Sequence, residues 1–275
     1  MNAVTKYTKR FFGEITILLV SAISIIPIIF AVLGAFKNSR EASLMRFTLP
    51  SEWVTDNIIK VVSNPAYQRS FINSLFYVAA TLTVTILITS MAAYVIARRK
   101  MKLNNFIYYL LICGMIVPWF VIPSIRLLQS LNLLATYQGV TLMYITANIP
   151  FSVFLMTGFI KGVPKDFDEA ACVDGCSPIR TFFQIIFPLL KPVTVTLLIW
   201  CGVSVWNDMQ IGLFFGGRMT FYPINVWTYM SIGERVTAWE NLFAATVITM
   251  LPAMILYLFA QKYIVSGMTA GAIKS

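Results

Sequence analysis

The segment GVPKDFDEAACVDGCSPIRTFFQIIFPLLK, residues 162–191, separates two long apolar runs and contains four acidic residues. Pro164 favours a helix start, and the acidic residues just after it would lie at the positive end of that helix. Gly175 is expected to end the helix, and Ser177 followed by Pro178 is typical of the N-cap and first residue of a second helix. The apolar residues of the second helix recur at the spacing of one helical face: Ile179, Phe182, Phe183, Ile186 and Leu190. The segment therefore predicts two short helices joined by a sharp bend.

The chain as a whole is too apolar for an ordinary water-soluble domain. Of its 275 residues 58% are hydrophobic and only 12% are charged, and the mean hydropathy is +0.77, whereas soluble domains carry about 25% charged residues. The contents of glycine (14), proline (12) and cysteine (4) exclude fibrous, disordered and disulfide-rich classes. The net charge of +10 could suit nucleic acid, but the basic residues cluster between apolar runs, where they act as topology signals. We therefore expect an integral membrane protein that does not bind nucleic acid.

Six apolar runs are long enough to cross a lipid bilayer, which requires about 20 residues in a helix. They are residues 15–36, 71–97, 103–125, 140–160, 192–215 and 242–261. Prolines inside the runs, which membrane helices tolerate as kinks, are Pro27, Pro118, Pro123, Pro150 and Pro252. The pattern predicts an all-α polytopic membrane protein with six transmembrane helices, and the kinks are typical of a transporter.

The lysines and arginines orient these spans. If the N-terminus is cytoplasmic, the inner segments hold 13 of them and the outer segments hold 8, which agrees with the excess of basic residues on the inner side of membranes. Both termini and residues 162–191 are therefore expected in the cytoplasm, and the inverted topology is the alternative. A surface hairpin of this kind either connects two spans with its charges in water or docks a soluble partner.

Catalytic chemistry has little support in the sequence. The chain has no histidine, which is the commonest metal ligand and the usual general base. Its four cysteines lie in apolar or membrane-adjacent segments and are expected to be small buried side chains. No GxxxxGK[ST] nucleotide-binding loop occurs. We therefore expect no catalytic residue, no metal and no cofactor in this chain, and we do not expect an enzyme.

The hairpin contains a pattern that resembles the EAA signature of permease subunits of ABC importers. That signature reads Glu-Ala-Ala, three residues, Gly, nine residues, Ile, one residue, Leu-Pro. The matching residues are Glu169, Ala170, Ala171, Gly175, Ile185 and Pro188. Phe187 stands in the place of the leucine and exchanges one apolar side chain for another. The resemblance favours a docking role for the hairpin over a passive connection.

Further matches make the chain similar to the smaller permease of the maltose-type sugar importers. They cover most of the chain: Asn73, Ser74, Leu75, Ala92, Ala93, Tyr94, Arg98, Pro118, Pro123, Trp206, Asn207, Asp208 and residues 261–275. The resemblance implies the ABC importer type I permease fold, a prokaryotic cell (inner) membrane and alternating access. It implies as partners a second homologous permease subunit, two cytoplasmic ATP-binding subunits that hold ATP and Mg, and an extracytoplasmic solute-binding protein. The solute would be a carbohydrate, an oligosaccharide or a related polyol.

The resemblance also assigns contacts to particular residues. Coupling to an ATPase subunit is assigned to Asp166, Glu169, Ala170, Ala171, Asp174, Gly175 and Pro188. Gly271, Ala272 and Lys274 in the tail, residues 262–275, would insert between the ATPase subunits, although the composition of the tail alone is that of a flexible end. An outer loop with Arg218, Tyr222 and Trp227 would contact the binding protein, and the alternative for its aromatic residues is a belt at the membrane edge.

Asp208 is the one acidic residue inside a predicted span, where a charge is costly unless it faces protein or water. Together with Trp206 and Asn207 it supplies a carboxylate, a stacking ring and an amide, which suit sugar hydroxyl groups. This triplet is therefore a candidate for the substrate pathway. A structural cap is the alternative role for Asp208.

Three other functions compete with a sugar importer. Glycerol phosphate or another non-sugar solute would use a permease of the same pattern. An ion-coupled secondary transporter would require buried ionisable pairs within the spans, for which Asp208 alone is weak support. An intramembrane enzyme would require paired acids, an activated nucleophile or metal ligands, and the sequence shows none of these. The sequence does not identify the solute.

Overall fold

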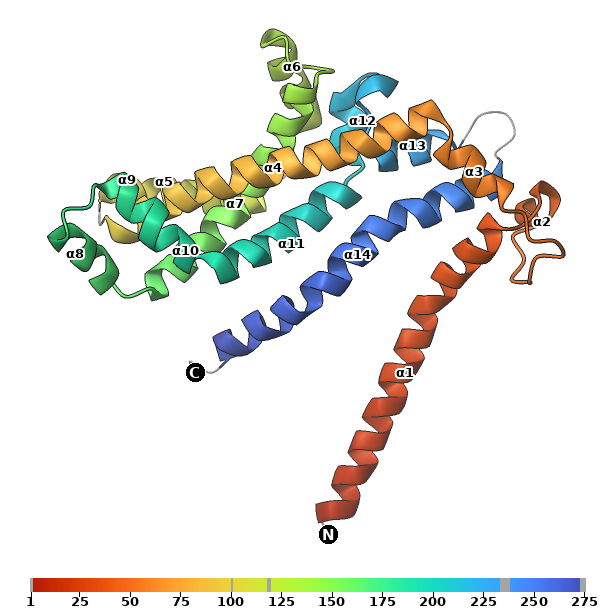
Figure 1. Cartoon of the computed structure of the whole chain (residues 1–275), viewed down its shortest axis with the longest axis horizontal. Coiled ribbons are helices and arrows are strands. Elements are labelled where there is room, and N and C mark those ends of the chain that lie inside the picture. Colours follow the sequence, from red (N-terminus) through yellow and green to blue (C-terminus); the bar gives the residue numbers. More distant parts are fainter. Residues whose placement is uncertain (1, 100, 118–119, 233–237, 273–275) are drawn as a thin grey trace. The chain divides into compact units, whose positions relative to one another are not determined.

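The computed structural model describes residues 2–99, 101–117, 120–232 and 238–272, with side chains described between residues 13 and 258. Throughout these ranges the regular structure is helical, and no strand occurs in them. The chain divides into two compact units, residues 1–68 with 228–251 and residues 69–227 with 252–275. Figure 1 labels the helices of both.

The first unit is built on the long helix α1 (Asn2–Ala35) and the first turns of α14 (Trp239–Ala272). The rings of Phe30 and Phe243 meet edge to face, with centroids 5.4 Å apart. The short helices α2 (Ser39–Ser43) and α3 (Asp56–Val62) follow α1.

A buried lysine organises the loop between these short helices. Lys37 is 3% exposed, and its Nζ donates to the carbonyl oxygen of Arg46 at 2.7 Å and to Oγ1 of Thr48 at 3.2 Å. The side chain of Asn57 donates to the carbonyl oxygens of Ala35 and Lys37. These bonds satisfy the buried amino and amide groups and hold the loop between α2 and α3, which has no regular structure, against the end of α1.

The second unit contains the predicted hairpin and the helices that support it (Figure 1). Its helices are α4 (Pro65–Arg98), α5 (Lys102–Ile116), α6 (Val121–Ser130), α7 (Tyr137–Gly162), α8 (Asp166–Val173), α9 (Pro178–Thr181), the π-helical segment η1 (Phe182–Ile186), α10 (Phe187–Leu189), α11 (Lys191–Asn207), α12 (Gln210–Gly216), the 3₁₀ segment η2 (Met219–Phe221), α13 (Ile224–Met230) and the end of α14.

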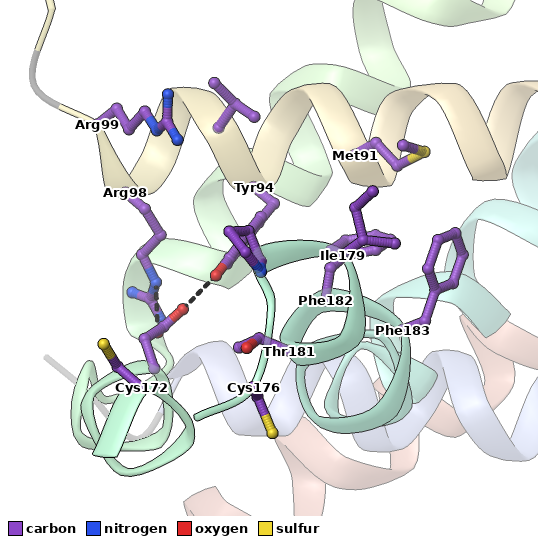
Figure 2. Close-up of a pocket in the computed structure, with 13 residues that line it drawn as sticks. Met91, Tyr94, Arg98, Arg99, Cys172, Cys176, Ile179, Thr181, Phe182 and Phe183 are labelled. Carbon is purple, nitrogen blue, oxygen red and sulfur yellow. Dashed lines mark hydrogen bonds and ion pairs between the residues drawn. The ribbon is translucent and has the colours of Figure 1, made fainter. Parts of the chain in front are cut away.

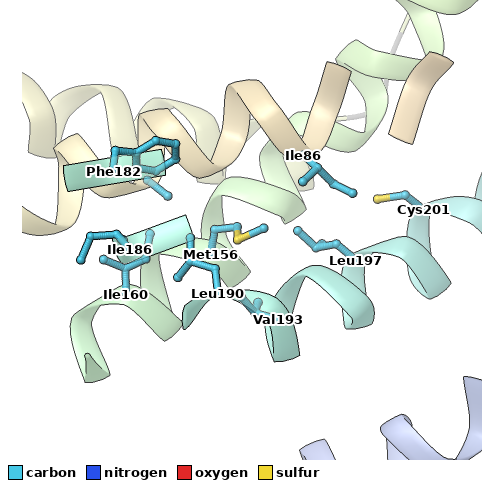
Figure 3. Packing of buried hydrophobic residues seen from close by; sticks show 10 residues of the cluster. Ile86, Met156, Ile160, Phe182, Ile186, Leu190, Val193, Leu197 and Cys201 are labelled. Carbon is cyan, nitrogen blue, oxygen red and sulfur yellow. The ribbon is translucent and has the colours of Figure 1, made fainter. Parts of the chain in front are cut away.

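One apolar cluster joins α4, α7, α11 and the second half of the hairpin (Figure 3). Its buried members are Ile86, Ala93, Met156, Ile160, Phe182, Ile186, Leu190, Val193, Leu197 and Cys201. Because Phe182, Ile186 and Leu190 lie in this cluster, the second part of the hairpin is anchored in the core of the unit and is not a loose surface loop.

Four helical stretches in the described ranges are long and apolar enough to cross a membrane: Gly13–Ala35, Pro65–Arg98, Tyr137–Gly162 and Trp239–Leu258. A fifth is formed if Pro178–Leu189 and Lys191–Asn207, which are bent by 73° at their junction, make one span. The predicted runs 15–36, 71–97, 140–160 and 242–261 correspond to the four single stretches. The count of six remains a prediction.

The predicted run 103–125 is not one helix. Helix α5 ends at Ile116, and α6 begins at Val121. Val117 has the extended conformation (φ −73°, ψ 120°), and the cause lies in the sequence, since the residue before a proline is driven out of the helical region. Pro118 itself lies outside the described residues. Helix α5 is therefore a shorter apolar helix of 15 residues.

The predicted run 192–215 is also interrupted. Helix α11 ends at Asn207, and α12 begins at Gln210. Asp208 is extended at the break (φ −69°, ψ 137°). The single acidic residue of the predicted span thus lies between two helices and not inside one.

Candidate functional site

The hairpin of residues 162–191 has the predicted helix, bend and second helix. Helix α8 carries three acidic residues in its first turn. At its end Gly175 has φ +73°, the left-handed conformation that glycine adopts without penalty. The N–H of Cys176 donates to the carbonyl oxygen of Ala171, and that of Gly175 donates to Cys172. This pair of bonds is the Schellman motif, which fixes the direction of the chain after the helix.

The second half of the hairpin starts as predicted and then departs from the prediction. Ser177 is the N-cap and accepts a bond from the N–H of Arg180, with Pro178 in the first turn. However, Ile179 and Phe183 of the predicted apolar face are 70% and 43% exposed. The segment Phe182–Ile186 is π-helical and therefore has more residues per turn than an α-helix. As a result the buried face consists of residues four apart, Phe182, Ile186 and Leu190.

The predicted coupling residues separate into exposed and buried groups. The exposed ones are Asp166, Glu169, Ala170, Asp174, Gly175 and Pro188. Ala171 is 1% exposed and packs inward. The exposed surface of α8 thus carries acidic residues beside Ala170, together with the apolar side chains of Phe167 and Val173, which are 43% and 89% exposed.

The structure shows an ion pair that the sequence does not indicate, between Arg98 and Asp168. Nε of Arg98, at the end of α4, lies 2.9 Å from Oδ2 of Asp168 in α8. The hydroxyl of Tyr94 donates to the other carboxylate oxygen, Oδ1, at 2.5 Å. All three residues line a cavity of about 370 Å³ between α4 and the hairpin (Figure 2). No local pattern indicated this pair, since its members lie on helices far apart in the sequence.

The candidate pathway triplet does not act as one group in this structure. Trp206 is 6% exposed and meets the ring of Phe71 edge to face at 5.7 Å. Asn207 is exposed. Oδ1 of Asp208 accepts a bond from the N–H of Ile211 at 2.8 Å, so Asp208 caps the first turn of α12. The capping role is observed, and contact with the solute remains a prediction.

The loop with Arg218 and Tyr222, which is predicted to lie outside, is fixed to the start of α4. Nδ2 of Asn73 donates to the carbonyl oxygens of Thr220 and Tyr222 at 2.9 and 3.0 Å. The hydroxyl of Tyr77 donates to the carbonyl oxygen of Phe221 at 2.8 Å. These bonds hold the backbone of the loop and leave Arg218 exposed.

The remaining predicted site residues give less information. Trp227 lies half-buried in α13. Helix α14 continues through the predicted tail to Ala272. Lys274 lies outside the described residues, and the side chains of Gly271 and Ala272 are not described. Within the part of the chain that the structure describes, no group of three or more Cys, Asp or Glu residues could hold a metal ion.

Several long apolar helices, with the short helices α8 and α9 between α7 and α11, are those of a polytopic membrane protein. The chain belongs to the family described as binding-protein-dependent transport system inner membrane component, which matches residues 85–270. The matched region contains the whole hairpin. It follows that the protein is a multi-pass inner membrane component of an ABC importer.

Individual relatives agree with this family. The melibiose/raffinose/stachyose import permease protein MelC of Bacillus subtilis is 33% identical over 232 residues, which cover 83% of this chain and 84% of MelC. The multiple sugar-binding transport system permease protein MsmG of Streptococcus mutans is 33% identical over 279 residues, which cover 100% of this chain and 98% of MsmG. A bacterial ABC transporter involved in the import of the acidic polysaccharide alginate has the same fold, with a TM-score of 0.82 and 20% identity over 93% of this chain and 97% of that chain.

The family membership decides between the competing classes of function. The relatives are transport permeases and not enzymes. The family is binding-protein-dependent, so the ion-coupled secondary transporter is wrong.

Proposed function

We propose that this chain is one of two permease subunits that together carry a carbohydrate, an oligosaccharide or a related polyol, into a prokaryotic cell. An extracytoplasmic binding protein delivers the solute. Two cytoplasmic subunits bind ATP and Mg and drive alternating access. Both termini and the hairpin of α8 and α9 lie in the cytoplasm, in agreement with the distribution of 13 inner and 8 outer basic residues.

The exposed acidic residues in the first turn of α8 are the observation that carries this proposal. Asp166 and Glu169 are exposed there beside Ala170. Ala171 packs on the opposite side, and the bend at Gly175 fixes the direction in which the chain leaves the helix. Charged groups that face solvent on a well-positioned helix form a surface suited to a basic cleft on an ATPase subunit.

The carbohydrate class is supported by the names of the relatives, which include importers of raffinose-type sugars and of multiple sugars. A thermal-shift screen of the cognate binding protein tests it. We expect the melting temperature to rise with an oligosaccharide of this kind. A rise with glycerol phosphate or another non-sugar solute, and with no carbohydrate, would contradict the carbohydrate class.

Replacement of Glu169 by lysine tests the docking surface. In the reconstituted complex we expect solute-stimulated ATPase activity to fall by about tenfold or more, since reversing a charge opposite a basic partner costs several kcal/mol. Glu52→Lys makes the same charge change at an exposed residue of the loop expected outside and should leave the activity unchanged. Full coupling in Glu169→Lys would count against this site.

Deletion of residues 269–275 tests the proposed contact of Gly271, Ala272 and Lys274 with the ATPase subunits in the same assay. Unchanged transport and unchanged ATPase activity in the shortened chain would exclude this contact.

A further inference from the structure

Asp168 is the acidic residue in the first turn of α8 that faces the protein. Its side chain is 20% exposed, and that of Arg98, its ion-pair partner, is 11% exposed. Tyr94 precedes Arg98 by one helical turn on α4, so the same face of α4 holds both carboxylate oxygens of Asp168. The exposed acidic residues of α8 are accessible to a partner subunit, whereas Asp168 binds residues of this chain.

Arg98 also binds the end of α7. Its Nη1 donates to the carbonyl oxygens of Ile160 and Val163 at 3.3 and 3.0 Å, and its Nη2 donates to that of Pro164 at 3.3 Å. The last carbonyl groups of a helix lack partners within the helix and carry partial negative charge, which a guanidinium group neutralises. The residues that supply these carbonyls lead directly into α8. One side chain therefore joins α4, α7 and α8.

The cavity of about 370 Å³ makes these contacts important (Figure 2). It separates the end of α4 from α8, whereas the apolar cluster joins α4 only to the second half of the hairpin, at Phe182 and Ile186. Close packing therefore does not transmit movement from α8 to α4. The contacts that bridge it are the ion pair of Arg98 with Asp168, the hydrogen bond of Tyr94 with Asp168, and the ring contact of Tyr94 with Phe182 at 5.4 Å. Without the two polar contacts, a displacement of α8 could be absorbed by closure of the empty space.

We propose that Arg98 is a positioning residue that makes the inner end of α4 move together with α8 when an ATPase subunit displaces that helix. This proposal rests on the proposed docking function of α8 and adds the route by which its movement reaches a membrane helix. Asp168 is the receiving group on α8, and Tyr94 holds the carboxylate in the orientation that faces Arg98.

The first test replaces Arg98 by glutamine in the full complex and measures the solute transported per ATP hydrolysed in proteoliposomes. We expect this ratio to fall by about fivefold or more, as typical coupling free energies allow, while the ATPase subunits still co-purify and hydrolyse ATP. Arg99→Gln removes the neighbouring, exposed guanidinium group and should leave the ratio unchanged. Arg98→Lys keeps the charge but not the forked donors, and should give an intermediate ratio. A wild-type ratio in Arg98→Gln would overturn the proposal.

The second test measures the movement itself and does not require the variant to assemble. Spin labels are placed at Val173 on α8 and Ile88 on α4, which are 89% and 49% exposed, after the four cysteines have been replaced. In the otherwise wild-type complex we expect the same label distance with and without ATP. A distance that changes between the two states would show that α4 and α8 move separately and would overturn the proposal. Failure of the wild-type chain to co-purify with ATPase subunits would instead contradict the proposed function.

Discussion

Replacing Gly139 by alanine is expected to destabilise the folded subunit by about 3 kcal/mol, in the upper range for an overpacked site. A Cβ atom at Gly139 would lie 1.9 Å from the carbonyl oxygen of Leu133. That oxygen cannot move freely, because it accepts a bond from Oγ1 of Thr136 at 2.7 Å. The same Oγ1 accepts the N–H of Gly139 and caps α7. The added methyl group must therefore displace either the cap or the preceding turn.

The preceding turn has little room to adjust. Asn132 and Ala135 already have positive φ angles of 56° and 55°, which are unfavourable for side chains other than glycine. The N–H of Ala135 is bonded to the carbonyl oxygen of Phe215. Because this turn also contacts α12, the strain would spread to a second helix of the same unit.

Thermal unfolding of the purified complex in detergent measures the effect of this change. Gly158→Ala is the matched control in the same helix, since nothing lies within 4 Å of its added Cβ, and alanine gains about 1 kcal/mol of helix propensity over glycine. The two variants should thus shift the melting temperature in opposite directions. Equal melting temperatures for Gly139→Ala and the wild type would show that the turn gives way without cost.

Local signals in the sequence predicted the hairpin, and their physical basis explains why. Gly175 can take a positive φ at no cost, and Ser177 followed by Pro178 caps a helix through atoms a few residues away. Each of these features depends on neighbours in the chain, so the residue types carry the information. The interruption after Val117 is also encoded locally, by the proline that follows it. A proline inside an apolar run predicts a kink, whereas the structure has the end of a helix there.

Contacts between distant residues could not be predicted in the same way. An arginine at the end of a predicted span is typical of a topology signal, and nothing in its neighbourhood shows that Arg98 pairs with Asp168. Asn73 likewise gave no indication that its amide holds the backbone at Thr220 and Tyr222. Such contacts depend on how α4 passes the hairpin at one end and the outer loop at the other. They appear only when the helices are placed in three dimensions.

Replacing Asn73 by leucine is expected to destabilise the loop that carries Arg218 and Tyr222 by about 1–2 kcal/mol, because an unsatisfied buried polar group costs about 1–3 kcal/mol and these bonds are only partly buried. Asn73 is 2% exposed. Besides its two donated bonds, its Oδ1 accepts a bond from the hydroxyl of Tyr137 at 3.0 Å. Leucine has a similar volume, so the loss would come from the broken hydrogen bonds and not from a cavity. The hydroxyl of Tyr137 can still donate to the carbonyl oxygen of Thr220, so the carbonyl oxygen of Tyr222 is the group most affected.

Asn73→Leu should also weaken the response of the complex to the binding protein. The loop carries Arg218 and Tyr222, which are predicted to contact the binding protein, so we expect stimulation of ATPase activity by that protein to fall while basal activity is retained. Tyr77→Phe removes only the bond to Phe221 and should have a smaller effect of the same kind. Asn105→Leu, at an exposed position of α5, controls for the loss of an amide. Equal stimulation in Asn73→Leu and Asn105→Leu would contradict a role for this loop in contact with the binding protein, because its anchor would then be dispensable.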